Sequence, residues 1–158
     1  MKTWTKKLTA LALIFALILT LLPSAPTEAA TKYTGTYQQT YKVPKSYGKV
    51  IIKPAYSVII NKISKGKIRF QVEFIGVNGS PLYQSNIITA KLKNKTTSFK
   101  WRDSWGNRGK GKMKLYKNYV KIKMIETKSS MRNRGTLARE QYLKLKKKSS
   151  NKKVYKWE

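Results

Sequence analysis

The sequence has no cysteine and no histidine, and only 6 of its 158 residues are acidic. Without cysteine there is no disulfide, no thiol nucleophile and no thiolate metal ligand. Without histidine, the side chain used most often as a general base and as a metal ligand is also missing. We therefore expect a fold that is stabilised by packing alone, with no metal and no cofactor.

The few carboxylates leave little scope for acid–base chemistry. Beyond residue 29 the acidic residues are Glu73, Asp103, Glu126, Glu140 and Glu158. A glycosidase needs two carboxylates held across a sugar bond, and the pair near loops is Asp103 with Glu140. We interpret Asp103 as an ion-pair partner of Arg102 or Arg108. Glu140 has Arg139 beside it, so no catalytic residue is assigned and the sequence predicts a protein that is not an enzyme.

The chain begins with an apolar segment. Residues 8–22 are apolar apart from two threonines, follow three lysines and end before Pro23. The segment is shorter than the roughly 20 residues of a membrane-spanning helix and is typical of a secretory signal peptide. We predict a helical signal peptide over residues 1–29, cleaved after Ala29 or Ala30, with retention as an anchor as the alternative. The rest of the chain is then expected outside the cell.

Positive charge is the strongest signal in the sequence. The chain has 35 lysine and arginine residues against 6 aspartate and glutamate residues. Removing residues 1–29 takes away three lysines and one glutamate, which leaves 32 basic and five acidic side chains and a net charge of about +27. Solubility requires a net charge of only roughly 2 to 8, and self-repulsion on this scale opposes folding. The excess favours an anionic partner, namely teichoic acid, anionic lipid or nucleic acid, and association with the cell wall.

Apolar residues recur at every second position along most of the chain, as they do in half-buried strands. Turn signals at Lys65-Gly66, Asn78-Gly79 and Asn94-Lys95 separate the segments. The pattern predicts an all-β fold, an antiparallel meander of about eight strands that forms a small barrel or a sandwich. We expect a barrel domain over residues 30–148 and a basic flexible tail over residues 149–158.

The positions of the turns also predict which residues face each other. In the first hairpin we expect Ile59 opposite Val72, with Glu73 pointing outward. In the hairpin around residues 94–95 we expect Ala90 opposite Phe99. The glycine-rich stretch from residue 102 to residue 111 is expected to be a loop.

A hairpin around Lys117-Asn118 brings like charges together. If these two residues form the loop, Lys114 faces Lys121 and Lys112 faces Lys123 on the outer side of the sheet. Facing like charges destabilise a strand pair, whereas mobile ammonium groups suit a flexible polyphosphate. We therefore predict a polyanion-binding face, and the same register adds outward lysines and neighbouring tyrosines at Lys91, Lys93, Lys100, Tyr116 and Tyr119. The alternative is a solvated strand face whose lysines lie over the tyrosines.

Trp105 stands in the glycine-rich segment between Arg102 and Arg108. An exposed tryptophan among arginines can stack on a sugar, a base or a lipid headgroup. The alternative is that Trp105 folds back and closes one end of the barrel. Trp101 is expected in the core.

The order of these motifs is similar to that of small secreted β-barrel proteins of Gram-positive bacteria, which resemble calycins and lysozyme inhibitors in shape. Between Tyr33 and Lys148 the motifs are YTGTY, ISKGKIRFQVEF, VNG, ITAKLKNKTTSFKW, KLYKNYVKIKM and RGTLAREQYLKL. The resemblance implies a small barrel without catalytic residues. Inhibition of a cationic lysozyme would need a carboxylate-rich surface, so this function is not predicted.

The sequence as a whole predicts a secreted, monomeric, non-enzymatic protein that associates electrostatically with anionic cell-envelope polymers, teichoic acid first among them. The first alternative is an extracellular protein that binds nucleic acid or an anionic membrane and depends on Trp105 or exposed tyrosines. The second alternative is a calycin-like protein that binds a small apolar ligand. Against it, large residues are expected to fill the interior: Phe70, Phe74, Phe99 and Trp101.

Overall fold

The structure is a computed structural model that describes residues 32–79, 81–130 and 135–155. The predicted signal peptide lies outside these residues. The described chain forms one nine-stranded sheet, which confirms the all-β fold. Its strands are β1 (Gly35–Thr40), β2 (Ala55–Ser64), β3 (Lys67–Ile75), β4 (Pro81–Gln84), β5 (Ile88–Lys91), β6 (Thr96–Arg102), β7 (Arg108–Leu115), β8 (Tyr119–Lys128) and β9 (Arg139–Ser149). Two short 3₁₀ turns, η1 (Lys45–Tyr47) and η2 (Val77–Gly79), lie between strands.

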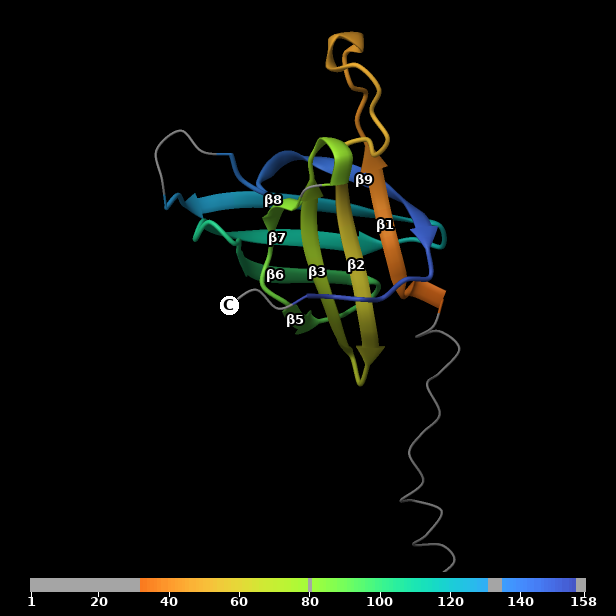
Figure 1. Cartoon of the computed structure of the whole chain (residues 1–158). Helices are drawn as coiled ribbons and strands as arrows, with labels where there is room; N and C mark the ends of the chain where they lie inside the picture. Colours follow the sequence, from red (N-terminus) through yellow and green to blue (C-terminus); the bar gives the residue numbers. More distant parts are fainter. Residues whose placement is uncertain (1–31, 80, 131–134, 156–158) are drawn as a thin grey trace, which may run out of the picture.

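The sheet is an antiparallel meander that curls on itself. The strand order is β4-β3-β2-β1-β9-β8-β7-β6, with β5 also paired to β3. The last strand of the chain, β9, therefore pairs with the first, β1. At the far ends of this order, Ser85 bridges Asp103, and the N–H of Asn86 donates to the carbonyl of Arg102 at 2.8 Å. In Figure 1, β1–β3 cross β6–β8, so the two halves of the sheet face each other in an open barrel.

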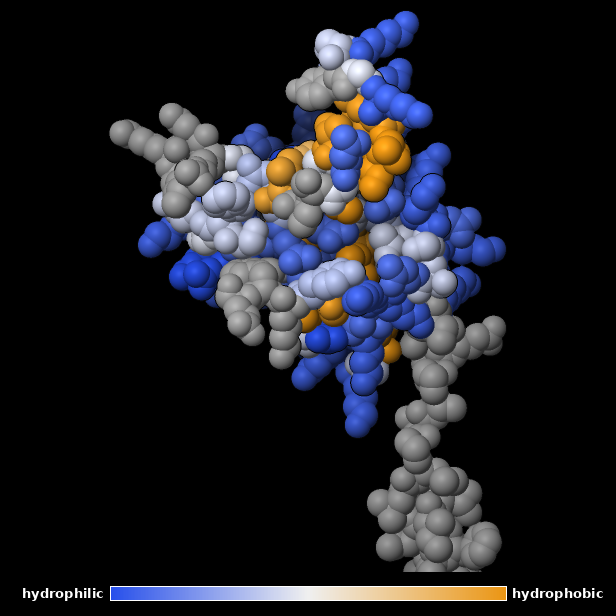
Figure 2. All heavy atoms as spheres, viewed as in Figure 1, coloured by the Kyte–Doolittle hydropathy of each residue, from blue (hydrophilic) through white to orange (hydrophobic). Residues whose placement is uncertain are grey.

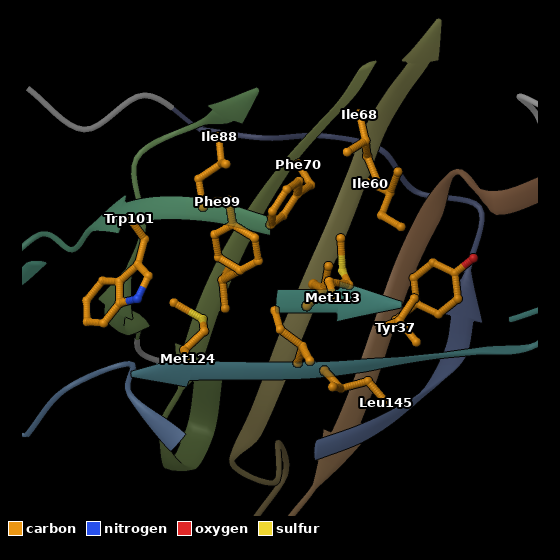
Figure 3. Close-up of a cluster of buried hydrophobic side chains, with 14 of the residues drawn as sticks. Tyr37, Ile60, Ile68, Phe70, Ile88, Phe99, Trp101, Met113, Met124 and Leu145 are labelled. Carbon is orange, nitrogen blue, oxygen red and sulfur yellow. The ribbon is translucent and has the colours of Figure 1, made fainter. Parts of the chain in front are cut away.

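The core fills the space between the two halves of the sheet (Figure 3). Phe70 and Phe99 meet edge to face there, with ring centroids 4.9 Å apart. Trp101 is buried as expected, and its Nε1 donates to the carbonyl of Lys110 at 3.3 Å. Aliphatic and sulfur-containing side chains occupy the remaining space: Val58, Ile60, Ile68, Met113, Ile122, Met124 and Leu145. Packed aromatic and aliphatic side chains thus occupy the interior.

The glycines of β7 explain why a glycine-rich segment is a strand here. The prediction of a loop as far as residue 111 is wrong, because β7 begins at Arg108. Gly109 and Gly111 face the core beneath aromatic rings, and a Cβ on Gly111 would lie 2.4 Å from Cζ of Phe99. A glycine in a strand often marks such a close approach. Glycine on the inner side and lysine on the outer side therefore alternate along β7.

The predicted register of the β7–β8 hairpin is confirmed. Lys114 lies opposite Lys121, and Lys112 lies opposite Lys123. The turn is closed by a hydrogen bond from the N–H of Tyr116 to the carbonyl of Tyr119, 2.9 Å long. A two-residue turn fixes the register of a hairpin, which is why this local prediction holds.

Two other registers differ from the predictions. An irregularity between Ile60 and Lys62 shifts β2 by one residue, so Val58, not Ile59, lies opposite Val72. An extra residue of this kind is a β-bulge, and every side chain beyond it changes face. The hairpin around residues 94–95 keeps the predicted pairing only beside its turn, where Lys93 bridges Thr96.

Beyond that bridge, β5 leaves its hairpin partner and pairs with β3. Ala90 therefore lies opposite Ile68 and not opposite Phe99, as the hairpin had suggested. Turn chemistry alone does not reveal this change of partner, because it depends on where β3 lies in the folded sheet. The change lets β5 connect the two halves of the barrel.

The described part of the predicted flexible tail is held against the sheet, whereas residues 156–158 of that tail lie outside the described residues. Residues 150–155, the C-terminal strap, cross the outer side of β1–β3 (Figure 1). The buried amide of Gln71 donates to the carbonyl of Tyr155 at 2.7 Å and accepts from its N–H at 2.9 Å. Two more side chains donate to strap carbonyls: Asn61 and Thr36.

Candidate functional site

Outward side chains of β6–β9 form a surface rich in lysine, which we call the lysine face. They come from alternate positions on each strand, because successive side chains of a strand point to opposite sides. All are exposed apart from the half-buried Lys123. The lysine face comprises Lys100, Lys110, Lys112, Lys114, Lys121, Lys123, Lys144 and Lys146.

Strand pairing arranges these lysines in rows across the sheet. One row runs from Thr96 through Lys114 and Lys121 to Lys144, and its neighbours are Ser98–Lys112–Lys123 and Lys100–Lys110–Ile125. Residues along a row are about 4.8 Å apart, and rows are about 6.7 Å apart because two residues separate them. No carboxylate stands in these three rows. The result is a lattice of ammonium groups on flexible stems.

A pair of tyrosines closes one end of the rows. The rings of Tyr116 and Tyr119 stack with centroids 4.3 Å apart and planes 10° apart. The ammonium group of Lys114 lies 5.6 Å from the Tyr116 ring centre, and that of Lys144 lies 4.5 Å from the Tyr119 ring centre. Cation–π attraction of this kind fixes the position of two lysines. The alternative of a solvated face expected lysines to lie over the tyrosines, and two lysines do so.

Tyr142 was not predicted as a site residue, and the structure places it within the lysine face. Its side chain is 54% exposed and separates two shallow grooves. The first groove, about 380 Å³, is lined by Thr96, Lys112, Met113, Lys114, Tyr116, Lys121 and Tyr142. The second, about 280 Å³, is lined by Ser98, Phe99, Lys110, Gly111, Lys112, Lys123, Ile125 and Tyr142.

The alternation in YLKLK could have indicated that Tyr142, Lys144 and Lys146 share one side of β9. The missing information was which strand β9 pairs with. β9 lies between β8 and β1, with Lys144 opposite Lys121. Its lysines therefore extend the face that the β7–β8 hairpin begins.

The predicted site residues divide into two groups. The lysines of β7 and β8 lie together, as do Lys100, Tyr116 and Tyr119. Lys91 lies apart, on β5 opposite Lys67 of β3, whereas Lys93, in the β5–β6 turn, lies opposite Thr96 and so continues the first row on that side. The continuous face therefore extends through β9 and not through β5.

Asp103 stabilises the loop between β6 and β7 by hydrogen bonds. It is fully buried, and its Oδ1 accepts hydrogen bonds from the N–H groups of Trp105 and Asn107 at 3.0 and 2.9 Å. Its Oδ2 accepts a third bond from the side-chain amide of Asn107 at 2.9 Å. A buried carboxylate needs such donors. The carboxylate that we considered for catalysis thus serves to hold a turn together.

Trp105 is partly packed against the barrel. Its Nε1 donates to the carbonyl of Leu82 at 2.8 Å, and its ring lies 6.5 Å from the ring of Tyr83, centre to centre. The side chain remains 42% exposed. Arg102 and Arg108 face each other at the adjacent ends of β6 and β7. The observed position lies between the two alternatives, because one part of the ring is covered and another part is accessible.

The buried titratable groups lie away from the lysine face. Burial raises the pKa of Glu73 above 4.5, partly offset by a hydrogen bond with Gln84. Burial raises the pKa of Tyr37 to about 12 and also raises that of Tyr56. The strand neighbours of Glu73, Ser57 and Gln84, carry no second carboxylate. Among the described residues, no cluster of three or more histidine, cysteine, aspartate or glutamate side chains could hold a metal ion.

Comparison of the chain with protein-family models, curated proteins and solved structures finds no match. The resemblance to calycin-like secreted proteins therefore stays a prediction. Within residues 32–79, 81–130 and 135–155, no helix has the length and apolar character needed to cross a membrane.

Proposed function

We propose that the protein is a secreted, monomeric, non-enzymatic protein whose lysine face binds an anionic polymer of the cell envelope, teichoic acid first. The observation that carries the proposal is the three rows in which lysines face each other across β6–β9 without an intervening carboxylate. A polymer with one phosphate in each repeat can place its charges between such rows.

The electrostatic cost of the lysine face supports this proposal. Four cross-strand pairs join two lysines: Lys100–Lys110, Lys112–Lys123, Lys114–Lys121 and Lys121–Lys144. Facing like charges destabilise a sheet by about 0.2–1 kcal/mol for each pair, so the face costs about 1–4 kcal/mol. A bound polyanion removes this repulsion and releases its own counterions, which makes binding dependent on salt.

The tyrosines favour an envelope polymer over single-stranded nucleic acid. Stacking on a base needs a free aromatic plane. Tyr116 and Tyr119 stack on each other, and lysine ammonium groups lie over both rings. The exposed ring of Tyr142 remains in the middle of the lysine face. Charge, provided by lysines that act as point donors, is thus expected to contribute most of the affinity.

Purified Gram-positive walls with and without teichoic acid provide the test, with residues 30–158 as the protein and salt as the variable. We expect retention to require teichoic acid and to fall steeply with salt. A variant with four lysines of the lysine face changed to glutamine should lower the slope of log K against log[salt] by about 0.7–0.9 for each phosphate that the protein no longer neutralises. The four changes are Lys112→Gln, Lys114→Gln, Lys121→Gln and Lys123→Gln.

A control variant removes the same charge elsewhere. Lys62, Lys65 and Lys67 lie around the β2–β3 turn, and Lys152 lies in the C-terminal strap, all outside the lysine face. Changing these four lysines to glutamine should alter the salt slope much less than the lysine-face variant does. Equal effects of the two variants would mean that total charge, and not this face, binds the polymer. Retention on walls that lack teichoic acid would reject the polymer itself.

A further inference from the structure

A second surface combines exposed aliphatic side chains with lysines. Residues 41–54, which join β1 to β2 and which we call the arm, stand out from the barrel (Figure 1). The N–H of Tyr41 closes the base of the arm by donating to the carbonyl of Pro54 at 2.8 Å. Asn78 of η2 supports the arm, since its N–H donates to the carbonyl of Ile52 at 2.9 Å and its Oδ1 accepts from the N–H of Ile51 at 3.3 Å. The arm is thus a projection with a defined shape.

The most exposed large aliphatic side chains of the described chain lie on the arm and beside it. Ile51 is 83% exposed, Ile52 is 49% exposed and Leu82 of β4 is 44% exposed. Ile52 packs over Gly79 of η2, and Leu82 packs over Gly76 just before η2, so this segment lies between the Ile52 and Leu82 side chains. Figure 2 shows hydrophobic surface gathered at this end of the molecule. Grouped exposed apolar side chains mark contact with a partner or a membrane more often than isolated ones do.

Lysines surround the aliphatic side chains of the arm. Lys42, Lys45, Lys49 and Lys53 are all exposed, and no aspartate or glutamate occurs between residues 32 and 72. A second copy of the chain is a poor partner for this surface, because a symmetric contact would bring the two sets of lysines together. A surface with an apolar interior and regularly placed negative charges fits both features. An anionic lipid bilayer has this chemistry.

We propose that the arm docks on an anionic lipid surface. The side chains of Ile51 and Ile52 enter the boundary between headgroups and acyl chains, and the four lysines contact lipid phosphates. The arm shares no residue with the lysine face, so this inference does not depend on the proposed polymer binding. Trp105 lies next to the docking surface through its bond to the carbonyl of Leu82, and we expect its indole to face the headgroups.

The absence of cysteine allows a fluorescent label at a single position. An environment-sensitive dye is attached to Ile51→Cys or, as a control, to Thr89→Cys, which is exposed on β5. The two proteins are mixed with phosphatidylcholine vesicles with and without phosphatidylglycerol, in the full chain and in residues 30–158. We expect the emission of the dye at position 51 to shift to the blue and to be quenched by a quencher attached to lipid chains, but only with vesicles that contain phosphatidylglycerol. The dye at position 89 should show neither effect. In the full chain the predicted signal peptide can itself insert and bring the barrel near the bilayer. The dye at position 89 reports that effect.

Two variants connect this signal to the arm. Ile52→Asp should lower the affinity for anionic vesicles tenfold or more, because it places a carboxylate where an aliphatic group enters the boundary. Retention of Ile52→Asp on teichoic acid should be unchanged, which separates this inference from the lysine face. Changing the four arm lysines to glutamine should abolish the preference for phosphatidylglycerol.

Three results would overturn the proposal. The first is a dye at position 51 that stays in water with every vesicle. The second is an equal response to neutral and anionic vesicles. The third is a response that rises with protein concentration without vesicles, because it would identify the surface as a contact between two copies of the chain.

Discussion

Replacing Lys121 by glutamine should make the free protein more stable while weakening its binding to a polyanion. Lys121 lies in the middle of the longest row and faces both Lys114 and Lys144. Each facing pair costs about 0.2–1 kcal/mol, so loss of this ammonium group should raise the free energy of unfolding by about 0.4–2 kcal/mol at low salt. For a domain of this size, each kcal/mol corresponds to about 3 °C in Tm.

Salt and a charge-matched variant separate this effect from a general loss of positive charge. The Debye length shrinks from about 30 Å at 0.01 M salt to about 3 Å at 1 M salt, so the gain should disappear at high salt. Lys49→Gln removes the same charge from the arm, which lies outside the strands and places no lysine directly opposite. We expect a smaller gain from Lys49→Gln at low salt.

Urea unfolding followed by tryptophan fluorescence at the two salt concentrations measures both variants. Teichoic-acid retention, measured in parallel, should fall for Lys121→Gln and change little for Lys49→Gln. The reasoning fails if Lys121→Gln is destabilising at low salt. It also fails if both variants gain the same stability, because the repulsion would then be a property of total charge and not of facing rows.

Three further changes test the fold of the barrel. Gly111→Ala places a Cβ 2.4 Å from Cζ of Phe99 and should lower the free energy of unfolding by about 1–3 kcal/mol; an unchanged urea midpoint would contradict this packing. Gln71→Leu removes the amide that bonds both backbone groups of Tyr155, so backbone hydrogen exchange in residues 150–155 should accelerate, and unchanged exchange would show that other contacts hold the strap. Burial raises the pKa of Glu73 above 4.5, so the folded state binds a proton on this carboxyl group more tightly than the unfolded state does. The protonated carboxyl group therefore stabilises the fold below pH 4.5, and this stabilisation is lost as pH rises through the raised pKa. Glu73→Gln should remove this loss between pH 4.5 and neutrality in unfolding measurements, and an unaltered pH profile would show that Glu73 is not its source.

Features that depend on neighbouring residues could be predicted from the sequence. The alternation of apolar and polar residues indicated strands, because side chains of a strand point to opposite sides. The Lys117-Asn118 turn then set the β7–β8 register, so Lys112, Lys114, Lys121 and Lys123 were placed correctly on one side. The registers of the other two hairpins were wrong beyond their turns, where a bulge in β2 and the pairing of β5 with β3 intervene.

The rest of the candidate site depends on contacts between distant segments. Tyr142 and Lys144 enter the lysine face because β9 pairs with β8, and no local pattern names that partner. The glycines of β7 suggested a loop, because the sequence alone does not show that Phe99 and Trp101 pack against them.

The sequence by itself determined that this chain is a highly basic set of strands and that one turn brings like charges face to face, since both follow from composition and from a side-chain period of two. Only the tertiary structure decided which strands extend that face, that β5 pairs with β3, and that residues 150–155 lie across β1–β3. The physical reason is that pairing between distant strands is selected by how their side chains fill a shared core, and short-range patterns do not encode that fit.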